Sequence, residues 1–98
     1  MPKPSLYPTD RGCFVCGNPD TVTHHIYPGY GRRDISDEEG CTVRLCNFHH
    51  NMSDHGVHAD RRLDSFFRED CQRRWEEREG TSGDGHRAFL ERFHITYL

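Results

Sequence analysis

The sequence is short of apolar residues, has no long hydrophobic run and contains almost no lysine. Only 33% of its 98 residues are hydrophobic, so a domain of this length has a thin core and needs a further source of stability. No apolar run approaches the ~20 residues of a transmembrane helix. The opening stretch, MPKPSLYPTD, lacks the apolar segment of a secretion signal. We therefore expect one cytoplasmic domain over residues 1–98, without a membrane partner.

The cysteines predict a metal site rather than disulfide bonds. Their number is odd, at five, and a reducing cytoplasm disfavours disulfides. Cys13 and Cys16 form a C-x-x-C pair, and further along the chain Cys46 and His49 repeat that spacing. Three thiolates and one imidazole suit tetrahedral Zn²⁺ with no open coordination position. We predict a structural zinc at these four residues, with Cys41 as a rival to His49.

The first half of the chain predicts two short strands. Residues 1–11 hold three prolines, which indicates an irregular arm. Residues 21–26 (TVTHHI) and 42–45 (TVRL) are rich in β-branched side chains, and we expect them to pair as a hairpin. Residues 27–40 combine one proline and three glycines with charged residues, which predicts an exposed loop. A helical turn is expected to begin near Asn47.

Residues 60–98 predict two helices that pack on the core. Asp60 fits an N-cap and Gly80 fits the end of the first helix. Between them the apolar residues recur at helical spacing. The residues expected to face the core are Leu63, Phe66, Phe67, Cys71 and Trp75. Asp84 is expected to cap a short last helix, and the terminal ITYL to pack back on the core. The apolar residues of that last helix are Phe89, Leu90 and Phe93.

A second group of histidines predicts another metal site. His49 and His50 are adjacent, so on a helical turn their side chains point about 100° apart. If His49 faces the zinc, His50 faces elsewhere and can meet His24 or His25. The candidates that complete this ligand set are Asp54 and His58. Three nitrogen or oxygen ligands with open positions are typical of a catalytic metal, and a remaining histidine could act as a general base.

In combination, these motifs resemble the HNH endonuclease superfamily. They are most similar to its small zinc-stapled members from bacteriophages and prophages, and the likeness covers nearly the whole chain. It is carried by the C-x-x-C pair, the His24-His25-Ile26 triplet, the loop over 29–33, the HHN-x-S-x-x-GVH run over 49–58 and the terminal Tyr97-Leu98. Cys41 departs from the family pattern, because it stands where the middle asparagine usually lies.

The resemblance implies a small α+β fold with a ββα-metal core in residues 12–58, stapled by the structural zinc. An amphipathic helix and a short last helix follow in residues 60–98. It also implies hydrolysis of DNA phosphodiester bonds with one divalent ion, which is Mg²⁺, Mn²⁺, Ni²⁺ or Zn²⁺. The implied ion ligands are His24, His50 and His58, with Asp54 as a rival for the last, and His25 matches the general base. The implied setting is the cytoplasm of a bacterial host or a phage-infected cell.

Arginine is the main cation of the chain, and this favours phosphate contact. Twelve arginines stand against one lysine, and the planar guanidinium matches a phosphate better than an ammonium group does. The residues expected to contact DNA, mostly at phosphates, are Tyr30, Arg32, Arg33 and Arg62. The formal net charge of −3 favours an alternative, a catalytically silent zinc-stapled module that binds nucleic acid or protein.

Overall fold

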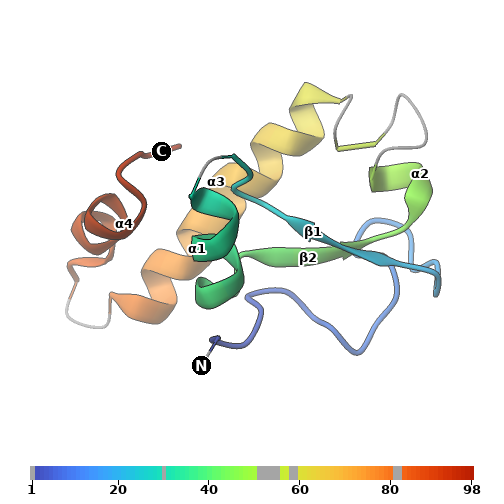
Figure 1. Ribbon diagram of the computed structural model, residues 1–98, viewed down its shortest axis with the longest axis horizontal. Helices are drawn as coiled ribbons and strands as arrows, with labels where there is room; N and C mark the ends of the chain where they lie inside the picture. Colours follow the sequence, from blue (N-terminus) through green and yellow to red (C-terminus); the bar gives the residue numbers. More distant parts are fainter. Residues whose placement is uncertain (1, 30, 51–55, 58–59, 81–82) are drawn as a thin grey trace.

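Two short strands and four helices form the part of the chain that the computed structural model describes, residues 2–29, 31–50, 56–57, 60–80 and 83–98 (Figure 1). Their order is β1 (Val22–His25), α1 (Arg32–Glu39), β2 (Thr42–Leu45), α2 (Asn47–His50), α3 (Arg61–Glu79) and α4 (Gly85–Phe93). The predicted small α+β class is confirmed. None of these helices combines the length and the apolar character that crossing a bilayer requires.

The two strands pair antiparallel, as predicted. Val22 lies opposite Leu45, and His25 lies opposite Thr42. β2 has the predicted bounds, whereas β1 is one residue shorter at each end than the predicted 21–26. The short helix α2 follows β2 almost at once and contacts both strands. The start of β1, the end of β2 and α2 therefore lie together at one end of the molecule (Figure 1).

The prediction of an exposed loop over residues 27–40 is wrong in its second half, because helix α1 occupies Arg32–Glu39. Gly31 and Gly40, both in the left-handed region with φ of 78° and 76°, bound this helix. Glycine adopts that conformation at little cost. The Ser36 hydroxyl is buried, donates to the Tyr27 carbonyl at 3.1 Å and accepts from the Tyr27 amide at 3.2 Å. These two bonds dock α1 on the segment that follows β1.

The aromatic core lies between α3, α4 and the segment after β1. Phe67 and Trp75 are buried on one face of α3, and Phe89 is buried on α4. Tyr97 stacks on Tyr27 with ring centroids 5.1 Å apart, so the predicted packing of the C-terminal ITYL is confirmed. The predicted N-cap of α3 is also confirmed, since the Asp60 side chain accepts from the amides of Arg62 and Leu63, and Asp84 stands at the N-cap position of α4.

One of the apolar residues expected to face the core is exposed instead. Phe66 on α3 is 48% exposed, and Leu90, an apolar residue of α4, is 38% exposed. Phe66 precedes the buried Phe67, and adjacent residues of a helix point about 100° apart. Only one of the two neighbours can face the core. Phe67 shares its face with the buried Cys71 and Trp75 at a spacing of four residues, and this face therefore turns inward.

The N-terminal arm has no helix or strand in its described residues, as predicted, and it packs on the core. Tyr7 is 2% exposed, and its hydroxyl donates to Asp70 of α3 at 2.6 Å. The Leu6 amide donates to the carbonyl of Gly40 at 2.9 Å. The arm therefore joins the end of α1 to the long helix α3.

Candidate metal centre and the neighbouring histidine cavity

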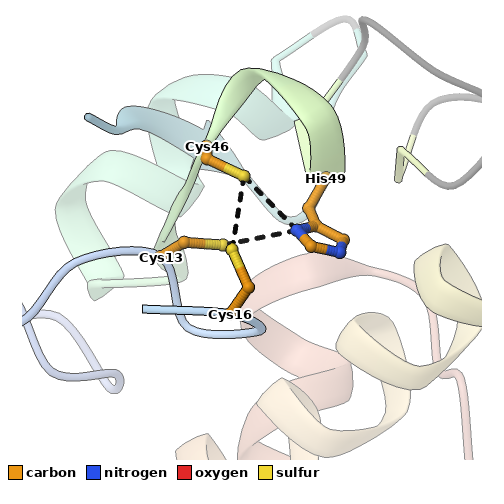
Figure 2. A group of neighbouring side chains, drawn as sticks. All are labelled: Cys13, Cys16, Cys46 and His49. Atoms are coloured by element: carbon orange, nitrogen blue, oxygen red, sulfur yellow. Dashed lines mark hydrogen bonds between the residues drawn. The ribbon is translucent and has the colours of Figure 1, made fainter. Parts of the chain in front are cut away.

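Four predicted ligands, Cys13, Cys16, Cys46 and His49, converge into one group, which we name the Cys3His cluster (Figure 2). The first two cysteines lie in the turn before β1, Cys46 directly follows β2, and His49 lies in α2. Their sulfur and nitrogen ligand atoms all lie within 4.8 Å of one another. The cluster could therefore hold one metal ion.

The distances within the cluster fit a tetrahedral ion. The Sγ atoms of Cys16 and Cys46 are 3.7 Å apart. His49 Nδ1 lies 3.3 Å from Cys46 Sγ and 3.7 Å from Cys13 Sγ. Tetrahedral zinc, with bonds of about 2.3 Å to sulfur and about 2.0 Å to nitrogen, separates its ligand atoms by roughly 3.5–3.8 Å. These three separations are therefore close to those that such an ion requires.

Local backbone bonds shape the turn that carries the first two cysteines. The Gly17 amide donates to the Cys13 carbonyl at 2.8 Å, and the Cys13 amide donates to the Asn18 carbonyl at 2.8 Å. Gly17 has a φ of 79°, which only glycine adopts readily. The Phe14 amide donates to the carbonyl of Arg44 at 2.9 Å, so this turn is tied directly to β2 and to the second pair of ligands.

The Cys13 thiol is disposed to ionise. Burial raises its pKa, but hydrogen bonds from the backbone amides of Cys46, Cys16 and Val15 and from the Cys46 thiol outweigh burial and lower the pKa to about 6. For the exposed Cys16 the Asn18 amide lowers the pKa, yet burial and the neighbouring thiols of Cys46 and Cys13 together raise it. A thiolate at Cys13 is the form that binds metal.

The remaining cysteines belong to the core. Cys41 and Cys71 are both fully buried, and neither is part of the Cys3His cluster. A hydrogen bond with the Cys71 thiol and burial raise the pKa of Cys41 far above its usual range. The rival assignment of Cys41 as zinc ligand therefore finds no support, and Cys71 packs in the core as predicted.

A second site lies beside α2, where histidines border a cavity of about 250 Å³. The residues that line it are Thr23, His24, His25, Pro28, Arg33 and His50. The rings of His24 and His50 have centroids 5.3 Å apart. His24 and His25 alternate along a regular strand, which predicts opposite faces, yet His25 is the last residue of β1 and both border the cavity. We name this site the histidine cavity.

His25 makes a contact that the sequence did not lead us to expect. Its Nε2 lies 2.7 Å from Oδ1 of Asp37 on α1. Arg33 and Asp37 are four residues apart on α1 and therefore share a face, and Arg33 also borders the histidine cavity. The sequence shows that Arg33 and Asp37 share a face only if residues 32–39 are taken to form a helix.

The other predicted site residues divide into two groups. Tyr30, Asp54 and His58 lie outside the described residues. Of the predicted phosphate-binding residues that the structure describes, Arg33 borders the histidine cavity, whereas Arg32 and Arg62 do not. Arg62 lies in the first turn of α3, where its backbone amide donates to the side chain of the N-cap residue Asp60.

Among the described residues, only the Cys3His cluster brings three or more possible metal ligands together. At the histidine cavity the described residues include two of the three predicted ligands, His24 from β1 and His50 from α2. Comparison with known proteins found no match to this chain among family models, curated proteins or solved structures.

Proposed function

We propose that this protein is a metal-dependent endonuclease that hydrolyses DNA phosphodiester bonds, with a zinc-stapled ββα-metal core of the HNH type. One observation carries the proposal. His24 of β1 and His50 of α2 approach each other, with ring centroids 5.3 Å apart, at a cavity that His25 and Arg33 also border. Histidine ligands, a further histidine and a guanidinium are the groups that metal-assisted attack on a phosphate uses.

The proposed ligands of the catalytic ion are His24 and His50. They come from two elements that contact each other, β1 and α2, so their separation is set by the fold. His58 is the proposed third ligand, and Asp54 is its rival; both belong to the segment that follows α2. A divalent ion (Mg²⁺, Mn²⁺, Ni²⁺ or Zn²⁺) supplies stabilisation of negative charge on the phosphate and on the leaving oxygen when bound there.

His25 is the proposed general base. It takes a proton from water while the water oxygen forms a bond to phosphorus and the bond from phosphorus to the 3′ oxygen breaks. The 3′ oxygen leaves with the bonding electrons and is protonated from solvent, so the products carry 5′-phosphate and 3′-hydroxyl ends. Arg33 is exposed at the cavity, where its guanidinium is accessible to a phosphate oxygen.

We propose Zn²⁺ as the ion of the Cys3His cluster, with a structural role. The donor set of three sulfurs and one nitrogen suits zinc, and four protein ligands leave no position for a substrate. The cluster joins the turn before β1 to α2, and α2 carries His50. A zinc ion here therefore holds the histidine cavity in shape without taking part in the reaction.

The proposal is tested by cleavage of supercoiled plasmid DNA with the purified protein in Mg²⁺, Mn²⁺ or EDTA. We expect metal-dependent relaxation of the plasmid that His25→Ala reduces by at least about 10²-fold, the usual contribution of general base catalysis. The zinc content and the melting temperature of His25→Ala should stay those of the parent, because its side chain belongs neither to the Cys3His cluster nor to the hydrophobic core.

His86→Ala is the matched control. His86 is an exposed histidine on α4 that pairs with Glu76, at the far end of the molecule from α2 (Figure 1). This variant should cleave as the parent does. A folded, zinc-loaded parent that leaves the plasmid intact in every metal would refute the nuclease, and equal cleavage by His25→Ala would refute the assignment of the base.

A second candidate function is a zinc-stapled binding module without catalytic activity. It is favoured by apolar side chains next to the cluster residues, since Phe14, Val15 and Phe48 are 38%, 45% and 50% exposed. Exposed apolar side chains become an interaction surface where they lie close together. A shift of DNA mobility by the protein, with no cleavage in any metal, would favour this candidate over the nuclease.

A further inference from the structure

We propose that Asp37 is the positioning residue of the general base His25, so that the two form a catalytic dyad in which Asp37 holds and orients the imidazole. The inference rests on the proposed function and deepens it. Asp37 lies on α1, in a stretch whose sequence suggests a loop, and it does not line the histidine cavity itself. Its carboxylate therefore acts through His25 rather than on the substrate.

The hydrogen bond between the two residues defines which nitrogen serves as the base. His25 Nε2 lies 2.7 Å from Asp37 Oδ1, and a carboxylate only accepts hydrogen bonds. Nε2 must then carry the proton, which leaves the lone pair on Nδ1. Because the His25 ring also borders the histidine cavity, Nδ1 is the nitrogen that takes a proton from water there.

The same carboxylate stabilises the charge that forms during the reaction. When Nδ1 accepts the proton of the attacking water, His25 becomes an imidazolium, and its Nε2–H already points at a negative oxygen. A carboxylate behind a catalytic histidine fixes the ring and stabilises its protonated form without being protonated itself. This contribution grows as the proton moves, so it lowers the barrier more than it strengthens substrate binding.

Buried contacts of α1 fix the position of Asp37. Its neighbour Ser36 exchanges two hydrogen bonds with the backbone of Tyr27, which lies two residues after His25. The Ser36 carbonyl also accepts from the Cys41 amide at 2.8 Å, and the Ile26 amide donates to the Cys41 carbonyl at 3.0 Å. The strand end that carries His25 and the helix turn that carries Asp37 are thus joined directly.

A role in stability alone accounts poorly for this pair. The Asp37 side chain is 56% exposed and that of His25 is 17% exposed, and a polar contact with one partner in solvent contributes little to folding. The pair can therefore orient a catalytic group while contributing little to the stability of the fold. The variant without the carboxylate should fold normally.

Asp37→Ala tests the dyad, with Asp34→Ala as control because it removes the same charge from the same helix. We expect Asp37→Ala to lower the rate of plasmid cleavage at saturating protein with Mn²⁺ by roughly 10- to 100-fold, as loss of a supporting hydrogen bond does, and to leave DNA affinity unchanged. In the His25→Ala background the same substitution should have no further effect, because Asp37 acts only through His25.

Proton NMR of the zinc-loaded protein supplies a readout that does not depend on activity. The hydrogen-bonded Nε2 proton of His25 should give a downfield resonance that Asp37→Ala abolishes and Asp34→Ala preserves. Cleavage by Asp37→Ala at the parental rate, or an additive loss in the double variant, would overturn the dyad while leaving the nuclease intact. Absence of cleavage by the parent would instead refute the nuclease and, with it, the catalytic role of Asp37.

Discussion

Neighbouring histidines of β1 border the same cavity but differ in burial and in partner. His24 is 3% exposed and lies opposite the buried Val43, whereas His25 is half-buried and contacts a carboxylate. The period of two in a strand produces this difference, and it fits the division of labour that we propose between a metal ligand and a base. At this scale the chemistry follows from single side chains and their nearest partners.

Cys46→Ser should abolish binding of the proposed structural zinc and unfold or loosen the protein. The Cys46 thiol lies 3.7 Å from that of Cys16 and 3.3 Å from His49 Nδ1, so its loss opens the ligand set. Structural zinc contributes roughly 10–16 kcal/mol of apparent binding free energy in small domains. Zinc content by elemental analysis and a thermal melt by circular dichroism would measure the effect.

Cys71→Ala is the comparison for this variant, because its thiol is equally buried but stands apart from the Cys3His cluster. It should retain one zinc per chain even if it melts earlier. A Cys46→Ser protein with full zinc content and the parental melting curve would contradict the structural assignment of the cluster.

At the scale of elements, α1 shows how tertiary contacts override local sequence. Its eight residues, RRDISDEE, are almost entirely polar, and a segment of this kind has little tendency to form a stable helix alone. In the folded protein, buried Ser36 and Glu39 and the half-buried Ile35 give it an inner face. The helix thereby presents Arg33 and Asp37 to the strand end.

Gly40→Ala should destabilise the protein more than Gly31→Ala does. Both glycines have a left-handed φ, of 76° and 78°, which a non-glycine residue adopts at a cost of about 1–3 kcal/mol. A Cβ at Gly40 would also collide with the Pro4 carbonyl, whereas a Cβ at Gly31 would meet nothing within 4 Å. Urea unfolding of the two variants measures the difference, and equal losses would show that the arm yields to the added methyl group.

At the scale of the whole molecule, Glu39 joins four parts of the chain. Its carboxylate accepts hydrogen bonds from Lys3 of the arm at 2.7 Å, from Trp75 of α3 at 2.9 Å and from Arg92 of α4 at 3.0 Å. The Glu39 side chain is 7% exposed. A buried carboxylate with this many donors is stabilised in its charged form, so it ties the arm, α3 and α4 to the end of α1.

The Glu39 contribution to stability should disappear in acid. Burial raises the pKa of this carboxyl, but the hydrogen bonds from Lys3, Trp75 and Arg92 outweigh burial and hold the pKa below its ordinary value of 4.5. A pKa that is lowered by folding adds stability above the unfolded value, and this stability is lost as pH falls through the folded value. Glu39→Gln should therefore unfold roughly 1–3 kcal/mol more easily than the parent at neutral pH.

Urea unfolding of parent and variant across pH tests this expectation. The gap between the parent and Glu39→Gln should shrink as pH drops below 4.5. Glu91→Gln, on an exposed ion pair of α4, should track the parent throughout. A gap that stays constant with pH would show that shape, and not charge, accounts for the effect of Glu39.

The sequence by itself was enough to locate the Cys3His cluster, β2, both caps of α3 and the packing of the C-terminus. The ligand pairs, β2 and the caps depend on residues close together in the chain, such as the paired spacing of Cys13 with Cys16 and of Cys46 with His49, and the C-terminal packing was indicated by the apolar character of ITYL. Short-range spacing is set by turn and helix geometry, which is nearly independent of the rest of the fold.

Only the tertiary structure decided the rest, because it depends on partners far apart in the chain. The helix over Arg32–Glu39, the burial of Cys41 and the contact of His25 with Asp37 all follow from how α1 docks beside β1. The exposure of Phe66 was decided by which face of α3 meets α4 and the arm. Local sequence specifies a pattern of apolar and polar residues that fits more than one local structure, and the packing of distant elements selects the structure that forms.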